Sequence, residues 1–394
     1  MRVTTLFNRM LRLPGTRVTD VRWEPDGVVV SVRRTRRRMV CLCGATSAAV
    51  YDRGLRRWRH LDACGMKIWL EAELCRIDCR SCGRVRTEVV PWARPRARHT
   101  LSFEQQVLWC ARRMDKTAVA ELMRVSWQTI DVMIMRSVDD PARLARLDGL
   151  RRIGVDEISY KRGHKYLTIV CDHDTGSVVW AGEGKTAAAL TEFYTALGPR
   201  RCALLKAVSM DLGIAYRQAT RAAAPKAKIC ADPFHLLKLA SKTVDVVRAR
   251  TLKSTSRDPQ LRWALLKRPD RLSAVQQQLL EQLAADETDA WRAWSHREQF
   301  RAVLKVQPSQ ARRAVDGWLA TAAASTVVPV RNLAGRMAKH RQMIINTITT
   351  GLNNGRLEGT NSKIRLLNHR GYGHHRPGAL IALIMLACSP EATL

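Results

Sequence analysis

The chain has 394 residues, with 67 Lys and Arg against 35 Asp and Glu and a formal net charge of +32. A hydrophobic content of 46% supports packed cores and excludes a disordered polycation. So large a positive charge is most often used to neutralise nucleic-acid phosphates, although ribosomal and membrane-surface proteins can also be basic. We therefore expect a protein of about two to four domains with a nucleic-acid partner.

The sequence shows no signal for export or for a membrane. Its first ten residues lack the apolar core and the cleavage site of a signal peptide. The longest apolar run, residues 379–388, is about ten residues long, whereas a membrane span needs about 20. Eleven cysteines, an odd number in a long chain, fit a reducing compartment. We expect a cytoplasmic, nucleoid-associated bacterial protein without a membrane partner.

Residues from about 20 to 90 predict short strands with paired cysteines. β-forming residues cluster at 28–32 and 67–74. Two cysteine pairs that each end in Gly resemble the knuckles of a zinc ribbon, in which Gly lets backbone amides face the thiolates. The first pair is C-x-C, one residue short, and Cys64 and Cys75 are alternative ligands. We predict structural zinc on Cys41, Cys43, Cys79 and Cys82; the alternative is a set of buried free cysteines.

Arginines flank this cysteine module. Arginine runs usually form a solvated face, but Trp58 lies among the arginines of residues 53–59, and a metal module beside them favours DNA contact. Residues 94–99 contain proline and alternating arginine, which predicts a basic linker. The candidate DNA contacts in these stretches are Arg36, Arg37, Arg38, Arg57, Arg96 and Arg98.

From Ser102 the apolar spacing becomes helical. Ser102 is expected to cap a first helix, and a second apolar series follows at Val119, Leu122 and Met123. With Val125 in a turn and Ser126 capping another helix, the layout is that of a helix-turn-helix, which a plain helical hairpin can imitate. The last helix should expose residues for DNA contact, namely Trp127, Gln128 and Arg136.

The predicted secondary structure changes from helices to strands near residue 150. Strands are predicted at 152–156, 164–171 and 177–181, then a helix at 187–197 and a strand at 203–210. A helix at 214–224, a strand at 227–231 and another helix after Asp232 follow. Three antiparallel strands and then helix-strand-helix-strand-helix is the order of the ribonuclease H-like fold. In that order Asp156 ends the first strand and Asp211 follows the fourth, and those strands are neighbours in the sheet.

A third carboxylate must then come from a later helix. The acids at 281–298 have helical spacing and are expected to form a solvated face. Glu358 instead begins a helix after the loop 351–355, and Lys363 and Arg365 follow it, so one helix can present a metal ligand and phosphate contacts. A helix-capping role is the alternative for Glu358. Carboxylate oxygens suit magnesium or manganese, and two such ions can support in-line displacement at a phosphodiester.

Several of these motifs, taken in order, resemble insertion-sequence transposases of the ISL-three type, one of the DDE transposases. They are the paired cysteines, the helix-turn-helix, Gly154-Val-Asp156-Glu157, Ser209-Met-Asp211-Leu, Ala231-Asp-Pro-Phe-His235 and Asn354-Gly-Arg-Leu-Glu358-Gly-Thr-Asn361-Ser-Lys363-Ile-Arg365. The set covers about Cys41 to Tyr372, and the ordered series is specific although no single motif is. The departure is the first cysteine pair, which that family usually spells C-x-x-C.

The resemblance implies that Asp156, Asp211 and Glu358 bind the catalytic metals. It also implies a mostly helical insertion and auxiliary roles for Asp232, His235 and Asn361, although a histidine packed on a helix is an equal alternative for His235. Tryptophans in the insertion, Trp291, Trp294 and Trp318, are expected to pack between helices rather than stack on a DNA base.

Together these observations predict a multidomain α+β and α/β protein. The expected domains are a zinc-binding module (1–93), a basic linker with a helix-turn-helix (94–148), a ribonuclease H-like core in two parts (149–235 and 346–394) and a helical insertion (236–345). The expected function is metal-dependent cleavage and transfer of DNA strands by a transposase bound to the terminal inverted repeats of its element. The partners would be double-stranded transposon ends and target DNA, and a second protomer or more. The alternatives are a transposase-derived regulator without catalysis and a ribonuclease H-like nuclease or resolvase.

Overall fold

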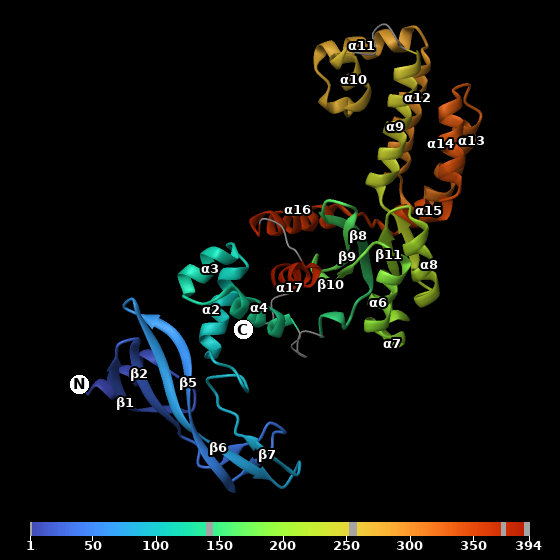
Figure 1. The fold of residues 1–394 in the computed structure, drawn as a ribbon. Coiled ribbons are helices and arrows are strands. Elements are labelled where there is room, and N and C mark those ends of the chain that lie inside the picture. The colour runs from blue at the N-terminus through green and yellow to red at the C-terminus, as the bar shows by residue number, and fades with distance from the viewer. Residues whose placement is uncertain (1, 139–144, 252–257, 372–375, 390–394) are drawn as a thin grey trace. The chain divides into compact units, whose positions relative to one another are not determined.

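The computed structural model describes residues 2–138, 145–251, 258–371 and 376–389 (Figure 1). The chain divides into two compact units, Met1–Arg136 and Ser137–Thr393. Each unit has its own β-sheet and its own hydrophobic core.

A five-stranded sheet forms most of the first unit. Its strand order is β1-β2-β6-β5 with β7 on β6, and β2 runs parallel to β6 while the other pairs are antiparallel. The strands are β1 (Thr16–Glu24), β2 (Gly27–Arg34), β5 (Val50–Ala63), β6 (Met66–Cys79) and β7 (Arg84–Thr87), and the short β3 (Met39–Val40) and β4 (Thr46–Ser47) form a separate pair. The predicted strands are present, but short strands were expected, whereas β5 and β6 are 14 residues each. A helix that the sequence analysis missed, α1 (Val3–Leu11), buries Phe7 in this core.

The structure changes two interpretations of the basic stretches of this unit. Trp58 is 1% exposed and packs edge-on against Trp92 with ring centroids 5.7 Å apart, so it belongs to the core and does not face DNA. Residues 94–99 are not a free linker, because Ala97 is buried and the Arg98 carbonyl accepts a hydrogen bond from the Arg59 amide at 2.9 Å. Backbone pairing with β5 holds the segment in place.

Three helices end the first unit, namely α2 (Leu101–Ala111), α3 (Lys116–Met123) and α4 (Trp127–Val138), whose last two residues belong to the second unit. Ser126 caps α4 as predicted, since its Oγ accepts a hydrogen bond from the Thr129 amide at 3.3 Å. The predicted cap of α2 is wrong by two residues: the Thr100 hydroxyl accepts from the Phe103 amide at 3.3 Å, and Ser102 lies inside the first turn. Thr100 has the extended backbone that a helix cap requires.

The sheet of the second unit has the order β10-β9-β8-β11-β12. Its strands are β8 (Arg152–Lys161), β9 (Lys165–Asp172), β10 (Val178–Glu183), β11 (Ala207–Met210) and β12 (Lys228–Ala231). β8, β9 and β10 pair antiparallel, whereas β11 runs parallel to both β8 and β12. The predicted adjacency of the first and fourth strands is thus confirmed. Two bounds differ, because β8 continues past Asp156 to Lys161, and the predicted strand from 203 is shortened since α7 (Pro199–Cys202) precedes it.

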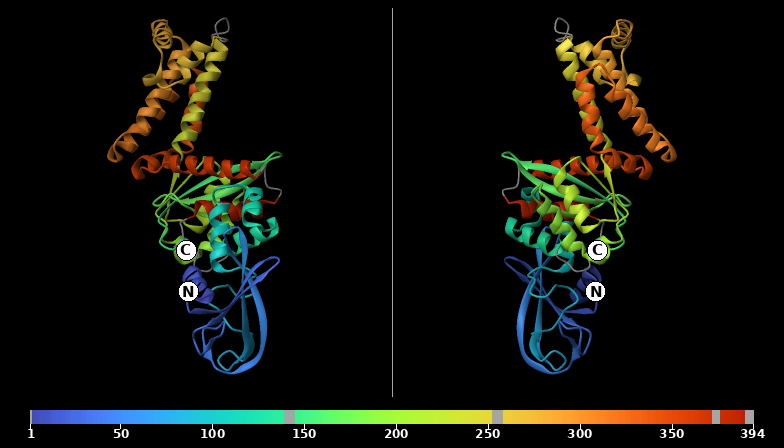
Figure 2. Two further views of the ribbon diagram at one scale, coloured as in Figure 1. Left: turned by 90° about the vertical axis from the view of Figure 1, so that its left-hand side faces the viewer. Right: turned by 90° about the vertical axis from the view of Figure 1, so that its right-hand side faces the viewer.

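Helices cover both faces of this sheet (Figure 2). Ile153 and Val155 of β8 pack in the core that includes α6 (Ala187–Leu197) and α8 (Ile214–Ala223). Ile158 and Tyr160 pack in the opposite core, under α16 (Gly355–Arg370) and α17 (Pro377–Cys388). Because side chains alternate along a strand, Asp156 shares the face of Ile158 and points toward α16.

A helical segment lies between β12 and α16 and extends away from the sheet in Figure 1. It consists of α9 (Pro233–Thr251), α10 (Pro259–Leu266), α11 (Ala274–Ala285), α12 (Asp289–Val303), α13 (Ala311–Ala323), α14 (Val328–Ala338) and α15 (Arg341–Thr350). Its last helix returns to the sheet, where the Thr347 hydroxyl donates to the Ala231 carbonyl at 2.7 Å. The predicted packing role of its tryptophans is confirmed, because Trp318 is 4% exposed against Phe300 and the half-buried Trp291 and Trp294 stack on each other. Glu298 was expected on a solvated face, but its side chain is 16% exposed and pairs with Arg297 and Arg301.

None of the helices among the described residues is both long enough and apolar enough to span a membrane.

Candidate active site

Asp156 lies on β8 with both carboxylate oxygens hydrogen-bonded. Oδ1 accepts from the Glu157 amide at 2.8 Å, and Oδ2 accepts from Nδ2 of Asn361 on α16 at 2.7 Å. Burial raises the pKa of Asp156, and the negative charge of Asp211 adds to that rise. The carboxylate is therefore held in one orientation in a partly buried position. A cation bound there would lower the electrostatic cost of its ionised form.

Asp211 follows β11 directly. In the parallel pairing of β8 and β11, Ser209 lies opposite Gly154, so the same register two residues on brings Asp211 level with Asp156. Neighbouring strands lie about 4.8 Å apart. Oδ1 of Asp211 accepts from the Gly213 amide at 2.8 Å. The Asp211 carboxylate is thus held by the backbone of the turn that follows β11.

Glu358 lies in the first turn of α16 and is exposed. Leu357 and Asn361, four residues apart, face the sheet, and Glu358 lies at the edge of that helix face. α16 packs closely on β8, because a Cβ on Gly154 would lie 2.7 Å from Leu357 Cδ1. Among the residues that the structure describes, only a cysteine cluster brings three or more metal-ligating atoms within 4.8 Å of one another. Asp156 and Asp211 are thus neighbours, while Glu358 is near them on α16 without joining a compact cluster.

A buried polar network that the sequence analysis missed anchors the start of α16. The Ser209 hydroxyl donates to Oδ1 of Asn354, the residue before α16, and accepts from Nε2 of His173 at 2.6 Å. Arg356 in the first turn donates to the His173 carbonyl at 2.9 Å. Ser209 and Asn354 are both less than 4% exposed. They are 145 residues apart in sequence, so no local pattern could have paired them.

The predicted auxiliary residues Asp232 and His235 lie at the end of β12 and the start of α9. Asp232 is 4% exposed, and its Oδ1 accepts from the Phe234 amide at 3.2 Å. Burial raises the pKa of Asp232, and Asp156 adds a smaller electrostatic contribution. His235 Nε2 is 3.8 Å from Asp232 Oδ2, and His235 lines one cavity together with Asp211. Both residues therefore border the Asp156–Asp211 pair.

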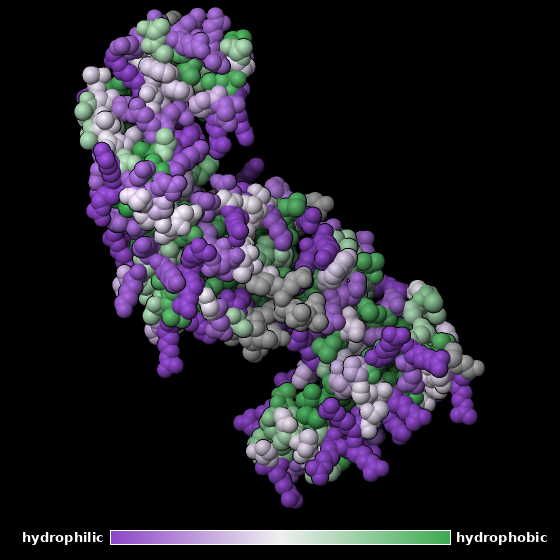
Figure 3. All heavy atoms as spheres, turned by 180° about the vertical axis from the view of Figure 1, so that it is seen from behind, coloured by the Kyte–Doolittle hydropathy of each residue, from purple (hydrophilic) through white to green (hydrophobic). Residues whose placement is uncertain are grey.

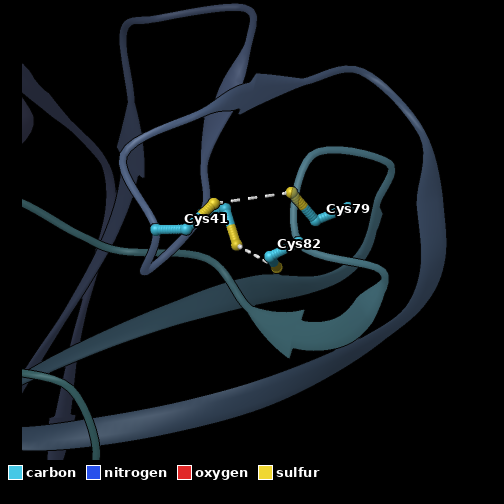
Figure 4. Close-up of side chains that lie close together, drawn as sticks. Cys41, Cys79 and Cys82 are labelled. Atoms are coloured by element: carbon cyan, nitrogen blue, oxygen red, sulfur yellow. Dashed lines mark hydrogen bonds between the residues drawn. The ribbon is translucent and has the colours of Figure 1, made fainter.

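The four predicted cysteines converge in the first unit (Figure 4). The Sγ atoms of Cys41 and Cys82 are 3.8 Å apart, and those of Cys43 and Cys79 are 3.7 Å apart. A tetrahedral zinc ion with Zn–S bonds of about 2.3 Å requires sulfur atoms about 3.8 Å apart. The Cys82 amide donates to the Cys79 sulfur and lowers the pKa of Cys79 to about 7. The short C-x-C pair thus fits zinc, and the group does not include Cys64 or Cys75.

Some of the predicted DNA-contacting residues have charged or polar partners within the protein, and others do not. Hydrophilic side chains cover much of the face shown in Figure 3. Two of the predicted arginines have carboxylate partners inside the unit: the Arg57 guanidinium bonds to Glu71 at 2.6 Å and to Glu24 at 2.9 Å, and Arg136 lies 3.7 Å from Glu104. The Lys363 ammonium donates to the Ala387 carbonyl at 2.6 Å. The exposed candidates without a carboxylate partner among the described residues are Arg36, Arg37, Arg38, Arg96, Arg98, Trp127, Gln128, Lys363 and Arg365.

Comparison with known families matches three parts of the chain. A family model described as "Transposase" of the ISL3 DDE type matches residues 153–384. The model "Helix-turn-helix domain of transposase family ISL3" matches residues 88–138, and "zinc-finger of transposase IS204/IS1001/IS1096/IS1165" matches residues 42–82. These segments contain the candidate acids, the helices α2 to α4 and three of the four clustered cysteines.

Two full-length relatives support the same assignment. The transposase for insertion sequence element IS1557 of Mycobacterium tuberculosis is 36% identical over 425 aligned residues, which cover 98% of this chain and 96% of the relative. The transposase for insertion sequence element IS1001 of Bordetella parapertussis is 26% identical over 373 residues, covering 91% of this chain and 92% of the relative. The chain therefore belongs to the ISL3 family of DDE transposases, with a zinc-ribbon domain and a DNA-binding helix-turn-helix preceding its transposase domain.

Proposed function

We propose that this transposase binds the terminal inverted repeats of its element, cuts the DNA strands there and joins the ends to target DNA. Asp156, Asp211 and Glu358 are the proposed catalytic residues. The observation that carries the proposal is the hydrogen bond from Asn361 to Asp156, because it holds the helix of Glu358 against the strand of Asp156. The DNA transposase function of the family supplies the reaction class.

The proposed metal is magnesium or manganese, held by the three carboxylates, whose hard oxygen atoms suit either ion. When bound, such ions activate the attacking oxygen and stabilise the leaving 3′ oxygen at a phosphodiester. The role of the protein groups follows from their contacts. The Glu157 amide and Asn361 orient Asp156, the Gly213 amide orients Asp211, and the Ser209 network positions the start of the Glu358 helix.

The fold proposed for the transposase domain is ribonuclease H-like. The strand order, and the placing of Asp156 on β8 and of Asp211 directly after the adjacent parallel strand β11, support it. The proposed core comprises residues 149–235 and 346–394, interrupted by a helical insertion at 236–345. Residues 1–93 and 94–148 are the proposed zinc module and helix-turn-helix region.

The exposed residues of the first unit are the proposed contacts to the terminal repeats. Trp127 and Gln128 at the start of α4 occupy the positions from which a recognition helix meets base edges. Arg36, Arg37, Arg38, Arg96 and Arg98 would contact phosphates, which position the protein without reading sequence. Lys363 and Arg365 would hold the phosphates next to Glu358. Since joining two ends requires two active sites, the proposed working complex contains at least two protomers.

The test uses a plasmid that carries a pair of the element's terminal repeats, incubated with protein and magnesium. Wild-type protein should nick the repeat ends and form strand-transfer products, whereas Asp211→Asn and Glu358→Gln should bind the ends without nicking. Glu192→Gln, at an exposed acid on α6, is the matched control and should keep full activity.

Four outcomes would contradict parts of the proposal. Wild-type protein that binds the repeats but never nicks them would instead identify a regulator derived from a transposase. Nicking without joined products would identify a nuclease or resolvase. Full activity of Glu358→Gln would remove Glu358 from the catalytic set. Paired-end complexes whose mass, measured by light scattering, corresponds to one protomer would refute the oligomeric assembly.

A further inference from the structure

A groove leads from Asp211 along the helical segment of the second unit. A cavity of about 420 Å³ is lined by Asp211, His235, Lys238, Lys242, Arg336 and His340. A second cavity of about 180 Å³ shares Lys242 and Arg336 with the first and continues past Arg250. The side chains come mainly from α9 on one wall and α14 on the other. The two cavities therefore form one continuous groove, which we call the α9–α14 groove.

The charge of this groove is strongly positive. Lys238, Lys242 and Arg250 on α9 and Arg336 on α14 are all exposed. The described residues provide no ion-pair partner for Lys242, Arg250 or Arg336. Asp245, the acid of the same part of α9, is already occupied by Arg248 at 2.9 Å and Arg262 at 3.9 Å. Apart from Asp211 at its mouth, the lining of the groove offers cations to a ligand.

The positive charges of the groove also act on His340, a histidine in its lining. Burial lowers the pKa of His340, and the charges of Arg217, Arg336 and Lys339 lower it further. Only Asp211 acts in the opposite direction. A linear polyanion would relieve this crowding of positive charge, because each phosphate could approach one or two of the cations.

An exposed aromatic ring lies beside two of the residues that line the groove, His235 and Lys238. Phe234, in the first turn of α9, is 54% exposed although it is a large apolar side chain. Its ring centroid lies 5.5 Å from the His235 ring and 6.0 Å from the Lys238 ammonium. A cationic groove with an exposed aromatic ring is the combination that binds single strands of nucleic acid, because every unpaired base can stack on the ring.

We propose that the α9–α14 groove binds a single strand of DNA that leaves the cleavage site. The phosphates lie against Lys238, Lys242, Arg336 and Arg250, and an unpaired base stacks on Phe234. A single strand fits better than a duplex, because an unpaired base can stack on the exposed ring of Phe234, whereas the bases of a duplex are stacked on one another. The location of the strand relative to the reacting phosphate rests on the catalytic role proposed for Asp211; binding itself does not.

The test measures binding alone, by fluorescence anisotropy of labelled oligonucleotides with full-length protein and no added divalent metal. The probes are a thymidine 12-mer, a 12-base-pair duplex of arbitrary sequence, and a terminal-repeat duplex with or without a single-stranded extension. The main variant is Lys242→Ala/Arg336→Ala. Its matched control, Lys305→Ala/Arg313→Ala, removes the same charge from exposed positions in the turn after α12 and on α13 that do not line the groove.

The groove variant should bind the thymidine 12-mer at least about tenfold more weakly than wild type. Its salt slope should fall by about 1.4, because each cation that no longer neutralises a phosphate of a single strand reduces the slope by about 0.7. Phe234→Ala should lose at least about fivefold, since one base stack is worth about 1–3 kcal/mol. The control pair should match wild type, and the blunt terminal-repeat duplex should bind all proteins alike. Unchanged thermal melting would show that the variants are folded.

Equal 12-mer affinity in groove variant and wild type would overturn the proposal. An equal loss on the 12-mer and on the 12-base-pair duplex would also overturn it, because the groove would then bind duplex DNA. Asp211→Asn should retain 12-mer binding, so this result is independent of cleavage. If Asp211→Asn still cleaves DNA while the groove variant loses the 12-mer, the catalytic assignment fails and the groove assignment stands.

Discussion

Asn361 donates a hydrogen bond of 2.7 Å to Asp156, which lies 205 residues earlier in the sequence. The amide holds a carboxylate of the sheet against the helix that carries Glu358. Oδ1 of Asn361 is buried without a hydrogen-bond partner among the described residues, so this side chain keeps an unused acceptor beside its bond to Asp156. One side chain thus links the two parts of the proposed active site.

Replacing Asn361 with Leu should lower the cleavage rate more than the affinity for DNA. The substitution keeps the branched shape and the number of heavy atoms but removes the donor, which costs about 1–2 kcal/mol and frees the Asp156 carboxylate to turn. Single-turnover cleavage of a saturating end substrate measures the rate, and anisotropy measures the affinity. Ser362→Ala, at an exposed hydroxyl of the same helix that bonds only within α16, is the control. Equal losses in both variants would show a general weakening of α16.

Magnesium should stabilise the protein more at pH 7 than at pH 4, which lies near the ordinary pKa of an aspartate. Burial raises the pKa of Asp156 above its ordinary value, so the folded state holds that proton more tightly than the unfolded chain. Its ionisation therefore costs stability as the pH rises from the unfolded-state pKa through the raised one, and a bound cation offsets this cost. Thermal melts with and without magnesium at the two pH values measure the difference. Asp211→Asn should abolish most of the magnesium effect, and an undiminished effect in that variant would place the binding elsewhere.

Cys43→Ser should lose zinc as completely as Cys79→Ser. Each change leaves a tetrahedral site with three thiolates, and zinc-bound ribbons depend on the metal for folding. Zinc content by mass spectrometry and the thermal stability of the purified chain are the measurements. Cys75→Ser, at a buried cysteine next to the cluster but outside it, is the matched control and should retain one zinc per chain. Full zinc in Cys43→Ser would show that the short C-x-C pair does not supply a ligand.

Arg37→Ala and Arg57→Ala should have different effects although both remove one arginine from the same unit. Arg37 is exposed, so its loss should weaken binding to any duplex and reduce the salt slope by about 1. Arg57 bonds to Glu24 and Glu71, so its loss should lower thermal stability and leave the salt slope unchanged. Anisotropy titrations at several salt concentrations and thermal melts separate the two. A reduced slope in Arg57→Ala would show that the guanidinium leaves its carboxylates to contact DNA.

The sequence by itself determined the modules and their order. Cysteine pairs ending in Gly, helices with caps, and strands with regular apolar spacing are local patterns, so the zinc cluster, the helix Ala187–Leu197 and the adjacency of the Asp156 and Asp211 strands all followed from it. Errors of one or two residues arose where competing caps lie close together, as at Thr100 and Ser102.

Only the tertiary structure decided which polar groups meet. Trp58 and Arg57 lie one residue apart in an arginine-rich stretch, but β-strand alternation and the partner strand bury the first and pair the second with carboxylates. The contacts of Asn361 with Asp156 and of Ser209 with Asn354 join segments more than 140 residues apart. Local sequence carries no information on such pairs, because the packing of α16 on the sheet, and not the chain near either residue, sets their distance.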